Sequence, residues 1–235
     1  MRALQQLKPT LPVLLSFNGG YVDTAGFLAL QGLFAAHVTG NFVTIGAALV
    51  FGTAGILTKL MALPVFCVVI VLTRWASFTR PGHLWPTLRT MLTLKVILLF
   101  IGAGLAIRLG PFTNGNGWPA LVTGMTFVAA MAIQNAAHRI HLGASPPSTL
   151  MTGTTTQLMI DIADTLHGLP ADKREATRVR MRRMSRAAAS FAGGAALAAL
   201  LFSTTGMWCF AMAPLVALLA WIGARSMPEV TVSNS

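Results

Sequence analysis

Apolar residues along the chain gather in long stretches rather than in the short amphipathic segments of a soluble domain. A helix needs about 20 apolar residues to cross the hydrocarbon core of a bilayer, and six stretches meet that requirement. They cover residues 11–36, 60–78, 90–109, 118–140, 187–203 and 207–222. The pattern therefore predicts an all-α integral membrane protein.

Two further stretches are long enough to span but carry more polar residues. They cover residues 38–57 and 148–167, and each has a Thr-Gly step near its start, at Thr39-Gly40-Asn41 and at Thr152-Gly153-Thr154. Polar groups that face lipid are costly. We therefore expect each segment to enter the membrane as a short helix capped by its threonine, with unpaired amides in its first turn, and to return on the same side. Seven or eight full spans remain the alternative.

The composition agrees with a membrane protein. Of 235 residues, 54% are hydrophobic and 10% charged, and the mean hydropathy is +0.69, whereas a soluble domain is about one quarter charged. A soluble enzyme, a disordered chain and a disulfide scaffold all fit poorly. The net charge of +11 comes partly from a basic stretch at residues 168–186, which we expect to be a cytoplasmic loop. No aromatic platform accompanies it, so nucleic acid is not an expected partner.

The positions of Lys and Arg distinguish the two topologies. Eight full crossings would leave five basic residues on the outer side: Arg74, Arg80, Arg89, Lys95 and Arg139. Two re-entrant segments leave only Lys59 and Arg108 there. Because cytoplasmic loops carry an excess of Lys and Arg, we predict six spans plus two re-entrant segments. The N-terminus, interpreted as retained rather than cleaved, and the C-terminus are then both cytoplasmic.

This topology divides the single transmembrane domain, residues 1–235, into two similar halves, residues 11–109 and 118–225. Asp23 precedes the first Thr-Gly step by 16 positions, and Asn135 precedes the second by 17. Since each half makes three crossings, the second half must run upside-down relative to the first. Inverted repeats with short helices at corresponding places point to a transport site near the midplane.

The same motifs carry a family resemblance. The stretch from Phe17 to Asp23, the run His37-Val38-Thr39-Gly40-Asn41, the pair Gln134-Asn135 and the run Met151-Thr152-Gly153-Thr154 resemble the YoaK-type family over roughly residues 10–225. That family consists of bacterial inner-membrane proteins that share a domain of unknown function. The resemblance implies a multi-spanning bacterial inner-membrane protein, and transport is the activity that it suggests.

Our leading hypothesis is a transporter or channel that binds a small polar or anionic solute between the halves. Ten residues are predicted to line the site: Asn18, Asp23, Thr39, Gly40, Asn41, Gln134, Asn135, Thr152, Gly153 and Thr154. Asp23 and His37 are predicted to carry a coupling proton, although Asp23 is equally well interpreted as a structural acceptor for backbone amides. Asn18-Gly19-Gly20 predicts a break in the first helix, since glycine weakens helices.

The alternative is a non-transporting membrane protein, a structural or partner protein or a membrane enzyme, in which the polar cluster is architectural or chemical. We do not expect an enzyme, because no nucleophile–base pair or phosphate loop is recognisable. We expect neither a metal nor a cofactor, because the two cysteines, Cys67 and Cys209, are far apart and lack metal-ligand spacing. The expected partners are the lipid bilayer and the solute. Small residues between Ala188 and Ala196 predict a close helix–helix approach.

Overall fold

The computed structural model describes residues 10–76, 78 and 86–224. Every regular element in those ranges is helical. In chain order these elements are α2 (Leu11–Ala29), α3 (Gly40–Phe51), α4 (Ile56–Ala76), α5 (Leu88–Leu109), α6 (Trp118–His141), α7 (Met151–His167), α8 (Ala171–Thr205), the 3₁₀ helix η2 (Gly206–Ala211) and α9 (Met212–Ala224). Four basic residues that contribute to the topology prediction lie outside the described ranges: Arg2, Lys8, Arg80 and Arg225.

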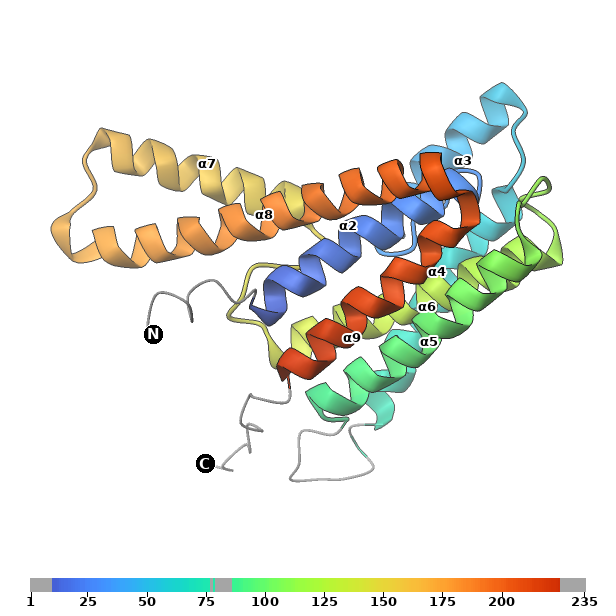
Figure 1. Ribbon diagram of the computed structural model, residues 1–235. Coiled ribbons are helices and arrows are strands. Elements are labelled where there is room, and N and C mark those ends of the chain that lie inside the picture. Colours follow the sequence, from blue (N-terminus) through green and yellow to red (C-terminus); the bar gives the residue numbers. More distant parts are fainter. Residues whose placement is uncertain (1–9, 77, 79–85, 225–235) are drawn as a thin grey trace.

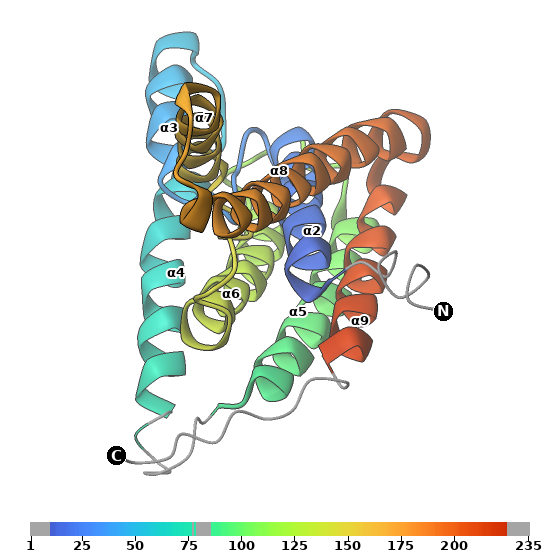
Figure 2. The same ribbon diagram turned by 90° about the vertical axis from the view of Figure 1, so that its left-hand side faces the viewer.

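Helices α2, α5, α6 and α9 pack around one apolar core (Figures 1 and 2). The rings of Phe127 and Phe210 stack there with centroids 5.0 Å apart. Tyr21 donates its hydroxyl hydrogen to the carbonyl of Cys209 at 2.6 Å, so its one polar atom is satisfied inside the core. All four of these side chains are buried.

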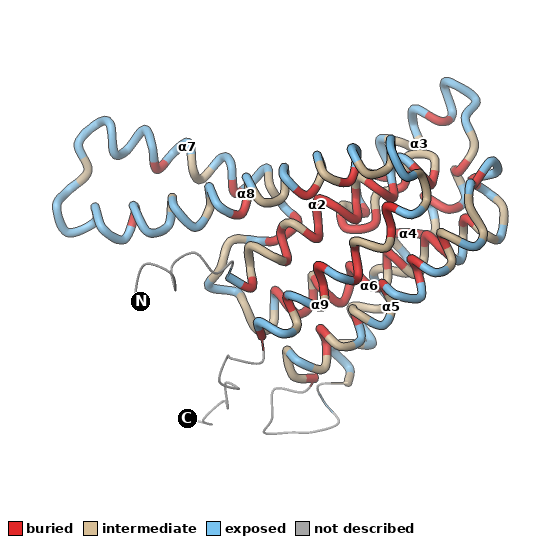
Figure 3. The backbone as a smooth tube through the Cα atoms, in the orientation of Figure 1, coloured by how far each residue is buried: buried red, intermediate tan, exposed pale blue. Residues whose placement is uncertain are grey.

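The outer surface of the helices is apolar as well. Figure 3 shows exposed residues along the outward face of α5. Large apolar side chains are exposed on both α4 and α5, among them Val71, Leu72 and Phe100. Within the described residues four stretches are long and apolar enough to cross a membrane: Ile56–Ala76, Leu88–Leu109, Trp118–His141 and Ala171–Ala224. The last stretch contains both α8 and α9, which run antiparallel in Figure 1 because the chain reverses near Gly206, at φ 57°.

The first predicted span, residues 11–36, extends too far. Helix α2 ends at Ala29, and the amide of Leu30 donates to the carbonyl of Gly26 at 2.8 Å. Gln31 and Gly32 then adopt positive φ angles of 54° and 86°, which the backbone of a continuing helix does not allow. Residues 30–39 form a loop instead, although their composition is as apolar as that of the helix.

Helices α2 and α8 cross with their backbones in contact. A Cβ atom at Gly20 would collide with the carbonyl of Phe191, and one at Gly194 would collide with the carbonyl of Phe17. The close approach predicted from the small residues of α8 is therefore confirmed. The predicted helix break at Gly19-Gly20 is wrong, because α2 continues through both glycines, and Gly20 makes room for α8 instead.

Two short helices stand away from this bundle. Helix α3 has 12 residues and is about 18 Å long, too short to cross the ~30 Å hydrocarbon core. Among the described helices α3 contacts only α4, and α7 contacts only α8. Figure 1 shows α7 and the first half of α8 projecting together from the bundle. Asp161 of α7 is buried and accepts two hydrogen bonds from Arg180 of α8, both at 2.7 Å.

Candidate functional site

Asp23 binds the loop that follows α2. Its carboxylate accepts hydrogen bonds from the amides of Ala35 at 2.8 Å and Ala36 at 2.6 Å. It also accepts one from the amide of His37 at 3.2 Å, and the Nδ1 atom of the same residue lies 2.7 Å from the carboxylate. Residue 23 is only 3% exposed. Asp23 thus brings the loop 30–39 back along α2 and supplies the acceptors that this stretch of backbone needs inside a membrane.

Asn41 closes the same loop on itself. Its Oδ1 atom accepts from the amide of Phe34 at 2.8 Å, and its Nδ2 atom donates to the carbonyl of Phe34 at 2.9 Å. Gly40 lies against the Phe34 ring, where a Cβ atom would be 3.1 Å from the ring edge. Gly40 and Asn41, two of the residues predicted to line the solute site, thus lie at the loop that Asp23 binds, and the contacts of both are made within the protein.

The predicted capping at the start of α3 is wrong. Thr39 adopts helical backbone angles and makes no side-chain cap. The amides of Gly40, Asn41 and Phe42 donate to carbonyls three residues earlier, at 2.8, 3.2 and 3.2 Å. These amides are therefore hydrogen-bonded within a tight turn. The dipeptide Thr-Gly alone does not predict that turn.

In the second half of the chain, Gln134 and Asn135 hold the loop between α6 and α7. Gln134 donates from Nε2 to the carbonyl of Leu15 at 2.9 Å and to the hydroxyl of Ser148 at 3.0 Å. Thr149 donates from its hydroxyl to Oδ1 of Asn135 at 2.7 Å. Gln134 therefore fastens this loop to both α6 and α2.

Both loops meet the middle of α2. A Cβ atom at Gly19 would be 3.0 Å from the carbonyl of Ser148 and 3.3 Å from the side chain of Thr149. Asp23, which binds the other loop, lies four residues later and so on the same face of the helix. From this region α3 and α7 lead away in opposite directions (Figure 1).

The second Thr-Gly step lies apart from this meeting point. Helix α7 begins at Met151 with Leu150 in the N-cap position, so Thr152 is inside the helix and the predicted cap is wrong. Thr154 donates to the carbonyl of Leu150 at 3.2 Å. Gly153 has open space around its Cα atom. Of the second triplet only Thr154 is buried.

Asn18 is fully buried on α2, and its Nδ2 atom donates to the carbonyl of Ala213 on α9 at 2.8 Å. Its Oδ1 atom has no partner among the described residues, and neither has Oε1 of Gln134. The structure thus places four predicted site residues on or beside the middle of α2. These are Asn18, Asp23, Gln134 and Asn135, and two of them present unused acceptor oxygens to the protein interior.

Lys95 is a candidate residue that the sequence pattern did not single out. The topology prediction counts it with the loop charges at the inner end of the bundle, whereas it lies inside α5 with an exposed fraction of 0%. Leu92 and Leu99 flank it on the same buried face. Its Nζ atom has no hydrogen-bond partner among the described residues. The available signal is its position within a predicted span, where an ionisable residue is by default a functional candidate.

Lys59 is likewise counted as a loop charge in the topology prediction. It lies in the first turn of α4 and is only 3% exposed. The described part of the chain contains no cluster of three His, Cys, Asp or Glu residues that could hold a metal ion.

These features define a multi-pass membrane protein. The chain belongs to the family described as "Protein of unknown function (DUF1275)", whose model matches residues 11–223. It is 32% identical over 160 residues to "UPF0700 transmembrane protein YoaK" of Bacillus subtilis (strain 168), an alignment that covers 67% of this chain and 68% of the relative. The resemblance to the YoaK-type family is thereby confirmed. No solved structure matches the chain.

Proposed function

We propose that the protein is a transporter or channel for a small polar or anionic solute, built from two inverted repeats of three spans and one re-entrant segment each. Proton coupling through Asp23 and His37 is part of the proposal. The observation that carries it is the convergence of two polar loops, one from each half of the chain, on one face of α2. Short helices that begin near the middle of a bundle are typical of transport sites.

Hydrogen bonds at equivalent places support the inverted repeat. Asp23 and His37 in the first half of the chain contact each other through their side chains. Asn135 and Thr149 in the second half are separated by the same number of residues and also share a hydrogen bond. The ends of α2 and α6 correspond in the same way. There Leu30 donates to the residue four positions earlier at 2.8 Å and Leu142 does so at 2.9 Å.

The charge inside the bundle supports an anionic solute. The carboxylate of Asp23 is surrounded by donors, whereas Lys95 is buried with no partner among the described residues. Leaving an ammonium group unpaired in a membrane interior is costly. A negatively charged solute bound near Lys95 would supply the missing partner.

One observation favours a second candidate, a non-transporting membrane protein with an architectural polar cluster. The hydrogen bonds of Asp23 and Asn41 all join parts of the protein to each other. In that case the loops would be structural elements and no solute would cross.

Uptake into proteoliposomes tests the proposal. We expect a pH gradient to drive accumulation of at least one member of a panel of small carboxylates, phosphate and neutral polar solutes. His37→Gln should abolish the part of that uptake that the pH gradient drives, because glutamine keeps a hydrogen-bond donor but cannot carry a proton. The matched control is His167→Gln at the exposed end of α7. Uptake of every solute at the level of protein-free vesicles would favour the non-transporting candidate.

We also propose that the protein lies in a bacterial inner membrane with the tip of the α7–α8 hairpin, at Gly168, in the cytoplasm. Arg74 and Arg139, in the last turns of α4 and α6, lie at the bundle end nearer this hairpin, whereas Arg108 lies in the last turn of α5, at the opposite end. A topology reporter inserted at Gly168 should therefore report the cytoplasm, and one at Asn114 the outside. The reverse pair of signals would overturn this orientation.

A further inference from the structure

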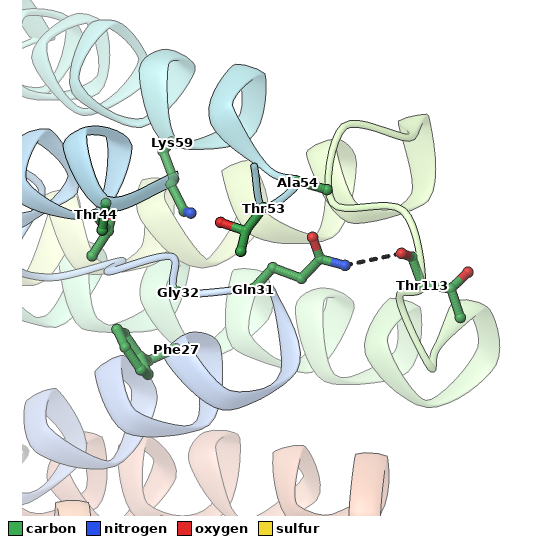
Figure 4. Close-up of a pocket in the computed structure, with 9 residues that line it drawn as sticks. Phe27, Gln31, Gly32, Thr44, Thr53, Ala54, Lys59 and Thr113 are labelled. Atoms are coloured by element: carbon green, nitrogen blue, oxygen red, sulfur yellow. Dashed lines mark hydrogen bonds between the residues drawn. The ribbon is translucent and has the colours of Figure 1, made fainter. Parts of the chain in front are cut away.

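A pocket of about 610 Å³ lies between the end of α2, the helix α3 and the start of α4. Figure 4 shows Phe27, Thr44, Thr53 and Lys59 around it, with Gln31 directed toward the neighbouring loop. None of these five residues belongs to the predicted solute site. The volume is in the range of small-molecule sites.

Lys59 provides the charge of this pocket. Only 3% of the residue is exposed, and in Figure 4 its amino group points into the space between Thr44 and Thr53. Its stem lies beside Gly32 and Gly55, where added Cβ atoms would be 3.6 and 3.7 Å from Cε. The backbone amide of Lys59 donates to the carbonyl of Gly55 at 3.1 Å, whereas its amino group has no hydrogen bond or ion pair with the described residues.

The other lining groups complement an anion. No lining residue is acidic. Thr53 presents a hydroxyl group that can donate, while Phe27 and Ala54 supply apolar surface beside it. Gln31 is held in place because its Nε2 atom donates to the carbonyls of Phe112 and Thr113 at 3.1 and 3.0 Å. The side chain of Gln31 is thus held in place without a ligand.

We infer that this pocket binds the anionic oxygen group, a carboxylate or a phosphate, of a small molecule, with Lys59 as its counter-charge. A short aliphatic carboxylate matches the lining best, because its alkyl part would contact Phe27 while its oxygens contact Lys59 and Thr53. A lipid headgroup phosphate has the same chemistry at this end of the bundle. The inference concerns binding alone and stands whether or not the solute is carried across.

Thermal unfolding of the full chain in neutral detergent tests the inference, with sodium butyrate and sodium phosphate titrated against sodium chloride at equal ionic strength. At ten times its dissociation constant, a ligand of the native state should raise the midpoint by ~3–6 °C. We expect such a shift for butyrate in the wild type and in Lys59→Arg, and its loss in Lys59→Met. Arg108→Gln, an exposed charge at the same end of the bundle, is the matched control and should keep the shift.

A second arm identifies the source of the anionic group. The same variants are compared in vesicles of phosphatidylcholine alone and of phosphatidylcholine with phosphatidylglycerol. A Lys59-dependent shift produced by anionic lipid but by no free anion would assign the pocket to a headgroup. Equal shifts in the wild type and Lys59→Met, or no shift in either arm, would overturn the inference. Flux is measured separately, so failure of transport and failure of binding are distinguishable.

Discussion

Replacing Lys95 with methionine is expected to raise the thermal midpoint of the purified protein by about 5 °C, which corresponds to roughly 2 kcal/mol in a chain of this size. Lys95 is completely buried on the inward face of α5 and has no partner among the described residues. Removing an uncompensated buried charge relieves its desolvation cost. Methionine is unbranched and flexible, so it can fill the space of the lysine stem. Fluorescence-monitored unfolding in detergent measures the change.

The matched control for Lys95→Met is Arg89→Met, which removes an exposed charge from the first turn of the same helix and should leave the midpoint unchanged. A lower midpoint in Lys95→Met would mean that the lysine has a stabilising partner. If stability rises while vesicle uptake falls, the lysine is retained for function at the expense of stability, a common arrangement at functional sites.

Asp23→Asn is expected to destabilise the protein by about 3 kcal/mol. The carboxylate accepts from three loop amides and contacts the ring of His37. An asparagine side chain keeps one acceptor oxygen, while its amino group would face groups that also donate. Each buried donor left unsatisfied costs roughly 1–3 kcal/mol, so the loop 30–39 should separate from α2.

The midpoint of unfolding and the protease sensitivity of the loop measure this effect together. Asp164→Asn, on the exposed face of α7, removes the same charge and should change neither. If Asp23→Asn unfolds at the wild-type midpoint with the loop still protected, other contacts hold the loop and Asp23 has no dominant structural role.

The sequence predicted the helical class, most of the apolar helices and the polar residues that hold the loops. It could not predict where α2 ends, because most residues from Leu30 to Ala36 are apolar and the chain reverses through the positive φ angles of Gln31 and Gly32. A glycine in α2 is compatible either with a break in the helix or with a close contact to another helix. Which of the two occurs depends on Phe191 of α8, which is far away in the sequence.

The two lysines show a second limit. The topology prediction counts Lys59 and Lys95 by charge alone. It does not consider whether each side chain points into the protein or toward its surface. The apolar flanks of Lys95 place it in a span, yet the face of α5 that points inward is set by its neighbours α6 and α9. The pocket beside Lys59 depends on the turns at Gly32 and Gly55, which bring together residues from α2, α3 and α4.

The crossing of α2 and α8 restricts how the molecule can change shape. With the carbonyl of Phe191 occupying the place of a side chain at Gly20, neither helix can slide along the other without first separating from it. We therefore expect both helices, together with the loops bound to α2, to move together in any change of shape. Helix α4 touches the rest of the bundle mainly through α6, and this pair provides the surface on which a rocking motion would occur.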